Sequence, residues 1–355
     1  MHKKFMLAAL EQAWLGRGLC APNPSVGAVL VHHQQIVAQA FHAGVGKPHA
    51  EQAMLEGFES KNFDNLTLYV TLEPCNHWGR TPPCVDIILK HPTIKTVIFG
   101  YRDPNPIVAK HNTPRILQEK NIHVQHYPLE EIDAFYQSYA RWMCTKQPWV
   151  TIKLAQTLDG KIAGEQGNPV HLSNIECSEF THSHRLHCDI ILTTAATILK
   201  DNPVFTARLN GESRSKPLAI LDRQLRLTGD EKVFQQQAPR HIFHDMQVTV
   251  VSPIEDCYYH PVPCHAGELD LPTVFNYIGE LGCHDVWIEV GGQLFSQLHA
   301  QNLLDTTYMY LVPEFLGQKA LSAYTNFCFP AKPRSVSWTV QEDNAILKME
   351  WMRGI

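Results

Sequence analysis

The hydrophobic and polar positions of the first 146 residues follow two periods, one typical of helices and one typical of buried strands. Helices are predicted over residues 2–15, 49–58, 81–90, 113–120 and 129–143. Short apolar runs predict buried strands over residues 26–31, 66–71, 96–100 and 122–126. Because strands and helices follow one another in this way, we expect a three-layer α/β/α domain.

The pattern starts again after Lys146-Gln147-Pro148, which ends a helix and marks the expected domain boundary. Residues 230–247 have the weakest pattern and are expected to lie on the surface. Further strands are predicted over residues 149–155, 190–193, 218–222, 248–251 and 286–290, with helices over residues 174–187 and 194–200. The sequence therefore predicts two domains, residues 1–146 and residues 147–355.

Gly291 and Gly292 follow the last predicted strand and open a helix, where free backbone amides could hold the phosphates of a cofactor. No Gly-x-Gly-x-x-Gly follows any predicted strand, so the Rossmann fingerprint is absent.

Composition narrows the class of protein. The 355 residues are enough for two domains, each with its own hydrophobic core. The formal net charge of -5 gives no excess of positive charge that would bind a nucleic-acid backbone. No apolar stretch reaches the length of a membrane span, and the run from Phe5 to Leu10 is too short for a signal segment. The 10 cysteines lack the regular spacing of a disulfide framework. We therefore expect a cytoplasmic protein that binds neither nucleic acid nor membrane.

The candidate chemistry lies between residues 49 and 84. His49, Cys75 and Cys84 offer one imidazole and two thiolates, a ligand set that suits Zn²⁺. A zinc ion with three protein ligands keeps its fourth position for water, as in catalytic rather than structural sites. Glu51, two residues after His49, can take a proton from that water and deliver it to a leaving amine. This combination predicts a hydrolytic deamination.

The order His-x-Glu, Pro-Cys and Cys matches the signature of zinc nucleoside and nucleobase deaminases. That signature usually closes with Cys-x-x-Cys, whereas a longer loop separates Cys75 from Cys84 and could add substrate contacts. A second interpretation stays open, in which the same residues form a structural zinc clip or part of a core and Glu51 is a solvated helix residue.

A few other polar residues lie at positions where either a functional or a purely structural role would explain them. Asn23 lies between two prolines before a strand, where its amide could reach a base edge or could serve turn geometry alone. His42 and His77 are the next histidines of interest after His49. Lys153 stands among the apolar residues of a strand, so it is either a functional residue with a partner or a surface lysine on an edge strand.

The motifs also carry a family resemblance. In chain order they are Pro-Asn-Pro-x-Val-Gly, His-Ala-Glu, Glu-Pro-Cys-x-His-x-Gly-x-Thr-Pro-Pro-Cys, then Lys153, Thr157-Leu158-Asp159-Gly160, Asp201-Asn202-Pro203 and Glu289-x-Gly-Gly. The chain resembles, over nearly its whole length, the bifunctional pyrimidine deaminase/reductase family of riboflavin biosynthesis. The resemblance implies a cytidine-deaminase-like domain followed by an α/β domain similar in fold to dihydrofolate reductase.

The resemblance also implies the reaction and the cofactors, Zn²⁺ and NADPH. The implied substrate is 2,5-diamino-6-(5-phosphoribosylamino)pyrimidin-4-one, a small phosphorylated pyrimidine. Its 2-amino group would be hydrolysed off first, and its ribosyl side chain would then be reduced to ribityl.

The resemblance assigns proton transfer to Glu51 and zinc binding to His49, Cys75 and Cys84. Around the deaminase substrate it places Asn23, His42, His77 and Arg80, with Arg80 near the phosphate. Around the reductase substrate it places Lys153, Arg185, Phe205, Arg208 and Glu289. Against NADPH it places Ala155, His171, Thr197, Asp201, Arg223, Gly291 and Gly292.

Some of these positions carry further information. Arg223 follows a strand end, where its guanidinium could pair with the 2′-phosphate that distinguishes NADPH from NADH or could be a solvated loop residue. His171 stands where the family pattern has tryptophan, and the turn near Ala195 lacks the usual glycine. These two departures bear on nicotinamide packing and on the affinity for the cofactor.

Three interpretations are compatible with the sequence. In the first, both halves catalyse a step. In the second, only the first half is a deaminase and the other half is degenerate or dimerising. In the third, the zinc is structural and the chain is a binding module. The sequence leaves open whether the chain forms a homo-oligomer.

Overall fold

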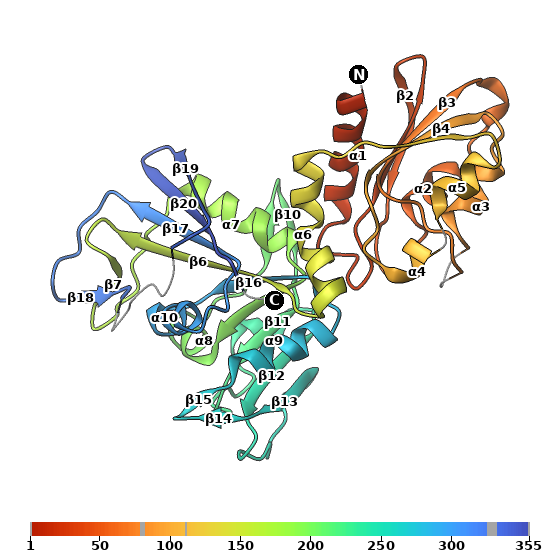
Figure 1. Cartoon of the computed structure of the whole chain (residues 1–355). Helices are drawn as coiled ribbons and strands as arrows, with labels where there is room; N and C mark the ends of the chain where they lie inside the picture. The colour runs from red at the N-terminus through yellow and green to blue at the C-terminus, as the bar shows by residue number, and fades with distance from the viewer. Residues whose placement is uncertain (1, 79–81, 111, 325–331, 354–355) are drawn as a thin grey trace. The chain divides into compact units, whose positions relative to one another are not determined.

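The computed structural model describes residues 2–78, 82–110, 112–324 and 332–353. The chain divides into two compact units, Met1–Lys146 and Gln147–Ile355 (Figure 1). Within the described ranges, no helix combines the length and the apolar character that crossing a membrane requires.

The first unit is built on a five-stranded sheet in the order β2-β1-β3-β4-β5. β1 (Gly27–His32) pairs antiparallel with both β2 (Gln35–Phe41) and β3 (Leu66–Leu72). β3, β4 (Ile94–Tyr101) and β5 (His123–His126) run parallel. The carboxyl ends of β3 and β4 therefore lie at the same edge of the sheet as the start of β1.

Helices cover both faces of this sheet, which confirms the three-layer prediction. Along β1, Val29 and Val31 pack in one cluster with α1 and α6, whereas Ala28 and Leu30 pack in another with α2, α3 and α5. This alternation is what a strand buried on both sides requires. The elements are α1 (His2–Gly16), α2 (Ala50–Leu55), α3 (Cys84–Leu89), α4 (Pro106–Lys110), α5 (Thr113–Gln118), α6 (Glu130–Thr145) and the 3₁₀ helix η1 (Ser60–Asn62) (Figure 1).

The second unit contains a nine-stranded sheet in the order β13-β12-β11-β8-β16-β6-β17-β20-β19. The strands from β13 to β17 are parallel, and β20 is antiparallel to both of its neighbours. The bounds are β6 (Trp149–Thr157), β8 (Ile190–Thr194), β11 (Leu218–Leu221), β12 (Arg240–Asp245), β13 (Cys257–Val262), β16 (Asp285–Glu289), β17 (Thr306–Val312), β19 (Ser335–Gln341) and β20 (Asn344–Glu350).

This sheet also has helices on both faces. Its largest core cluster joins β6, β8 and β16 to α9 (Leu271–Glu280) and α10 (Gly292–Ala300). On the opposite face, residues of α7 (Ile175–His187) and α8 (Ala195–Asp201) pack against alternate residues of the same strands and of β17. The smaller elements are β7 (Lys161–Glu165) with β18 (Ala320–Ser322), β9 (Ala207–Leu209) with β10 (Glu212–Arg214), β14 (Cys264–His265) with β15 (Glu268–Leu269), and η2 (Lys232–Gln235).

The predicted strand over residues 248–251 is wrong. The strand is Arg240–Asp245, inside the stretch that was expected to be a surface excursion. Its polar residues are buried because each finds a partner: Arg240 Nε donates to the carbonyl of Val233 at 2.8 Å, and His241 Nδ1 lies 2.9 Å from His260 Nε2. Hydrophobic patterning cannot detect a strand whose polar side chains are satisfied inside the fold.

Candidate active sites of the two units

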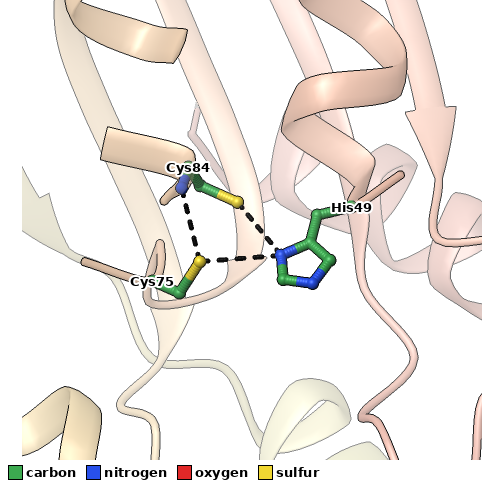
Figure 2. A group of neighbouring side chains, drawn as sticks. All are labelled: His49, Cys75 and Cys84. Atoms are coloured by element: carbon green, nitrogen blue, oxygen red, sulfur yellow. Dashed lines mark hydrogen bonds between the residues drawn. The ribbon is translucent and has the colours of Figure 1, made fainter. Parts of the chain in front are cut away.

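The predicted zinc ligands come from three segments of the first unit and meet at one point. His49 is the N-cap residue of α2, Cys75 follows the end of β3, and Cys84 begins α3. Nδ1 of His49 lies 3.3 Å from Sγ of Cys84 and 3.6 Å from Sγ of Cys75 (Figure 2). The backbone N–H of Cys84 also donates to Sγ of Cys75 at 3.3 Å, which holds the start of α3 against this sulfur.

These separations fit a zinc ion. Tetrahedral bonds of about 2.3 Å to sulfur and about 2.0 Å to nitrogen hold a sulfur and a nitrogen roughly 3.5 Å apart. The three ligand atoms lie within 4.8 Å of one another. A hydrogen bond from Cys84 lowers the pKa of Cys75 to about 4, so one sulfur is already a thiolate at neutral pH. The donor set therefore suits a metal with three protein ligands.

Glu51 lies in the first turn of α2, and only 3% of its surface is exposed. Burial, with the charge of Cys75 next in importance, raises the pKa of Glu51 to about 7. Its carboxyl group also takes part in a hydrogen bond with Cys84. A carboxyl group that gains and loses a proton near neutral pH, beside a metal site, is suited to general acid–base catalysis.

Two of the predicted substrate residues form one hydrogen-bonded chain. His42 is buried, its ring centroid lies 5.4 Å from that of His49, and its Nδ1 lies 2.9 Å from the carbonyl of Pro48. Because a carbonyl only accepts, Nδ1 carries the proton, and Nε2 accepts from Nδ2 of Asn23 at 3.3 Å. Burial lowers the pKa of His42, which keeps this tautomer neutral.

The loop between the two cysteines carries the remaining candidates. Nδ1 of His77 is buried and has no hydrogen-bond partner in the described ranges, as expected of a group that awaits a ligand. Arg80 lies outside the described residues. Asp103, which is not among the predicted site residues, follows β4 and accepts hydrogen bonds from the backbone of Asn105 and from Tyr139. Its position after a parallel strand already indicates, from the sequence, a loop at the edge of a binding crevice, although the sequence alone assigns Asp103 no role.

In the second unit, Arg185 and Glu289 form a buried bidentate ion pair. Nε of Arg185 donates to Oε1 of Glu289 at 2.6 Å and Nη2 donates to Oε2 at 2.8 Å. Nε1 of Trp287 donates to the same carboxylate at 2.8 Å, and Nη1 of Arg185 donates to the carbonyl of Thr206 at 3.1 Å. The pair thus ties α7 and β16 to the loop before β9. Trp287 was not predicted, although its position two residues before Glu289 puts both side chains on one face of the strand.

Lys153 lies beside this ion pair. Its neighbours across the sheet are Glu289 on β16 and Tyr308 on β17, and its Nζ lies 4.8 Å from the centroid of the Tyr310 ring. Burial lowers the pKa of Lys153, and the nearby carboxylate of Glu289 raises it by a smaller amount. No described residue accepts a hydrogen bond from this ammonium group, so its donors are available to a ligand.

Phe205 lies on the loop that Arg185 holds, and Arg208 lies in β9, the strand that follows it. Phe205 is buried at a left-handed φ of 54°, and the Arg185 guanidinium lies 5.4 Å from the centroid of its ring. Arg208 is exposed, and its backbone N–H donates to Nδ1 of His182 at 3.2 Å. A strained, buried aromatic residue beside an exposed arginine is an arrangement found at ligand sites.

Most of the predicted cofactor residues follow the carboxyl ends of neighbouring parallel strands. Arg223 comes after β11, Thr197 and Asp201 lie on the helix after β8, and Gly291 and Gly292 follow β16. Ligands of open α/β sheets bind at this edge.

The two glycines differ in their surroundings. A Cβ at Gly291 would meet nothing within 4 Å, whereas one at Gly292 would lie 2.5 Å from the carbonyl oxygen of Ala323. The exposed turn at Gly291 therefore leaves its backbone open to a phosphate, which fits NADPH.

The remaining candidates are less informative. Ala155 is half-buried on β6 and packs with Tyr310. His171 is exposed, in the segment before α7. Ala195 is fully buried at the start of α8, so the missing glycine is replaced by a residue that packs in the core.

The buried carboxylate of Glu289 makes the stability of the second unit dependent on pH. Burial alone would raise the pKa of Glu289, but the charge and hydrogen bonds of Arg185, with Lys153 and Trp287, lower it to about 2 from 4.5. A lowered pKa in the folded state stabilises the protein above about pH 4.5, and this contribution is lost as the pH falls toward 2. We expect Glu289→Gln to reduce the free energy of unfolding by about 3–5 kcal/mol at pH 7, because it leaves Arg185 without its counter-charge.

Urea unfolding of the full chain at several pH values measures this effect. The difference between wild type and Glu289→Gln should shrink as the pH falls from about 4.5 to 2. Glu165→Gln is the matched control, because Glu165 is exposed and its ion pair with Lys319 spans 3.9 Å. A difference that stays constant with pH would contradict the role given to the carboxylate charge.

Comparison with known proteins matches each unit to a family. Residues 1–101 match the cytidine and deoxycytidylate deaminase zinc-binding region, and residues 148–340 match the RibD C-terminal domain. The riboflavin biosynthesis protein RibD of Escherichia coli is 31% identical over 329 residues, covering 89% of each chain. RibD of Bacillus amyloliquefaciens is 32% identical over 327 residues, covering 89% of this chain and 86% of that protein.

A solved structure is similar over almost the whole chain. It is a diaminohydroxyphosphoribosylaminopyrimidine deaminase/5-amino-6-(5-phosphoribosylamino)uracil reductase from Thermotoga maritima, with a TM-score of 0.87, 31% identity and 98% of both chains covered. The expected fold classes are confirmed, a cytidine-deaminase-like unit followed by a dihydrofolate-reductase-like one. Neither a deaminase with a degenerate second half nor a binding module is favoured. The chain belongs to the RibD family of riboflavin biosynthesis and is a bifunctional enzyme, a zinc-dependent deaminase joined to an NADPH-dependent reductase.

Proposed function

We propose that residues 1–146 deaminate 2,5-diamino-6-(5-phosphoribosylamino)pyrimidin-4-one and that residues 147–355 then reduce its ribosyl side chain to ribityl. The observation that carries the proposal is the buried carboxyl group of Glu51 beside the cluster of His49, Cys75 and Cys84. The similar Thermotoga maritima enzyme bears the names of both reactions.

In the first unit, His49, Cys75 and Cys84 hold the zinc ion, which when bound makes water a nucleophile near neutral pH. Glu51 accepts a proton and returns it to the departing amine, so that ammonia leaves as a neutral molecule. Asn23, His42 and His77 line the pyrimidine pocket. We keep Arg80 as the partner of the substrate phosphate, because its loop joins two zinc ligands.

In the second unit, NADPH supplies the hydride, and the residues of the chain orient the two reactants. The ammonium of Lys153 donates to the substrate, while Arg185 and Glu289 fix the loop that carries Phe205 and leads into β9, where Arg208 lies. The exposed guanidinium of Arg208, whose Nη2 lies 3.4 Å from Nε2 of His182, meets the substrate phosphate. Ala155, His171, Thr197, Asp201, Arg223, Gly291 and Gly292 form the cofactor side.

We also propose that the enzyme works in the cytoplasm on a small molecule, without nucleic acid or membrane. None of the nine described cysteines is in a disulfide, which fits a reducing compartment, and the net charge of -5 does not favour a nucleic-acid partner. A homo-oligomer remains compatible with these observations.

One assay tests the two-step proposal. The purified chain should release one ammonia per diaminopyrimidine substrate in the absence of NADPH, and should oxidise NADPH only after that release. NADPH oxidation without ammonia release, or ammonia release with no subsequent oxidation, would contradict the proposed order or the second activity.

Zinc binding gives a separate prediction. The full chain, dialysed against a weak chelator, should keep one zinc per molecule, and Cys75→Ser should lose both this zinc and ammonia release, because one of the two thiolates among the three ligands is gone. Cys144→Ser is the matched control, since Cys144 is exposed and far from the cluster in sequence. Metal analysis of active protein that finds no zinc would contradict the ligand assignment.

A further inference from the structure

A second group of metal-binding side chains lies on the first unit, away from the deaminase site. His32 ends β1, and His33 and Gln34 form the two-residue turn to β2. Asp64 stands two residues before β3, which runs antiparallel to β1 with Val31 opposite Thr67. The sheet therefore brings the end of β1 and the start of β3 together, and with them two imidazoles and one carboxylate.

The three side chains already converge. Nε2 of His32 lies 2.8 Å from Oδ1 of Asp64, and Nε2 of His33 lies 3.9 Å from the same oxygen. One ligand atom from each residue falls within 4.8 Å of the others, as in the zinc cluster of the deaminase site. A metal with bonds of about 2.1 Å holds neighbouring ligand atoms roughly 3.0–3.4 Å apart, so small side-chain rotations would complete the site.

The surroundings hold two of these side chains in place. The ring of Phe63 meets the ring of His32 edge-on at 5.2 Å and stacks on Phe58 at 5.3 Å. Asn65 Nδ2 donates to the other carboxylate oxygen of Asp64 at 3.4 Å. Outer contacts of this kind orient metal ligands in proteins and leave one carboxylate oxygen for the metal.

His33 adds a second observation. It occupies the first turn position with a left-handed φ of 44°, where Asn or Gly is usually preferred. The strain at such a position costs on the order of 1 kcal/mol for a residue with a Cβ. The turn thus places an imidazole over Asp64, with the ring centroids of His32 and His33 4.0 Å apart.

We propose that His32, His33 and Asp64 form a second metal site, which binds a divalent transition ion such as Ni²⁺, Co²⁺ or Zn²⁺. Imidazole and carboxylate ligands select this class of ion over Ca²⁺ and Mg²⁺, which prefer oxygen. The side chains of His33 and Asp64 are 76% and 72% exposed, so water completes the coordination and the ion exchanges readily. The affinity is therefore weaker than that of the buried cluster with two thiolates.

The new site and the deaminase centre lie at opposite ends of the same strands. β3 leads from Asp64 toward Cys75, and β1 leads from the Asn23 segment toward His32. A strand of six or seven residues spans roughly 20 Å. An ion at His32 therefore takes no part in deamination, and instead links the β1–β2 hairpin to the segment before β3.

Cobalt distinguishes the two sites by the chemistry of their ligands. Zinc-loaded full-length protein, titrated with Co²⁺, should bind one additional equivalent without the intense sulfur-to-metal absorption that thiolate ligands give. His33→Asn removes the imidazole but keeps a residue that suits the turn, so the fold is retained. We expect His33→Asn to lower the affinity for the additional Co²⁺ by about 10–100-fold or more, since loss of a residue that only orients a metal ligand already has an effect of this size.

His123→Asn is the matched control, because His123 is an exposed histidine of the same unit outside the cluster. It should bind the extra Co²⁺ as wild type does, and both variants should keep the original zinc and the rate of ammonia release. An extra equivalent that persists unchanged in His33→Asn, or none in the wild type, would overturn the proposal. An extra equivalent with thiolate absorption would do so as well, because it would place the ion at a cysteine site.

Discussion

Glu51→Gln is expected to lose about 10²–10⁴ of the deamination rate while keeping its zinc. The amide has nearly the same shape as the carboxyl group, so α2 and the neighbouring ligand residue His49 stay in place. It cannot accept a proton from water or return one to the amine. Because Glu51 is buried and its pKa is raised to about 7, the wild-type group changes its protonation state near neutral pH.

The measurement is ammonia release by zinc-replete protein, with metal content determined on the same sample. Glu56→Gln serves as the control, since Glu56 is an exposed residue at the other end of the same helix. Reduction of the deaminated intermediate by the second unit should be unchanged in both variants. Ammonia release near the wild-type rate in zinc-replete Glu51→Gln would remove Glu51 from the mechanism.

Lys153→Ala is expected to abolish NADPH oxidation with the deaminated intermediate and to leave ammonia release largely intact. The ammonium is held between Glu289 and the Tyr310 ring with no hydrogen-bond acceptor among the described residues, so its donors are oriented for a ligand. Hydride transfer depends on close positioning of substrate and cofactor, and loss of one fixed contact removes that orientation. Asp201→Ala, on the cofactor side, should have the same selective effect.

Two controls separate this effect from misfolding. Lys319→Ala removes an exposed lysine of the same unit and should leave both activities unchanged. Circular dichroism and urea unfolding should show Lys153→Ala to be folded. Wild-type reduction by a folded Lys153→Ala protein would show that the reductase site lies elsewhere.

The deaminase centre could be predicted from the sequence because its residues lie close together along the chain. His49, Glu51, Cys75 and Cys84 fall within 36 residues, and each ligand borders a strand or helix whose period is clear. The spacing of these residues along the chain is therefore enough to predict that their side chains meet. The layers of the first unit followed from the same periods, because β1 and β3 are apolar on both faces.

The second site depends on contacts that no local pattern encodes. Arg185 and Glu289 are 104 residues apart, and only the order of β8, β16 and β6 in the sheet brings them together. The resemblance identified both residues but not their ion pair with each other. Strand β12 was not predicted for the same reason, because its buried arginine and histidine find their hydrogen-bond partners in other segments of the chain.

The two glycines after β16 are subject to different evolutionary constraints. Gly292 lies against the carbonyl of Ala323, so any side chain there is excluded by the fold, whatever the protein does. Gly291 faces open space, so the fold alone would tolerate other residues, and its retention would reflect the approach of a phosphate. A descendant that lost the reductase reaction but kept its structure would be free to drift at 291 while remaining fixed at 292. Substitution at 291 alone would then indicate that a lineage has lost the reductase activity, and substitution at 292 would indicate that it has lost the fold as well.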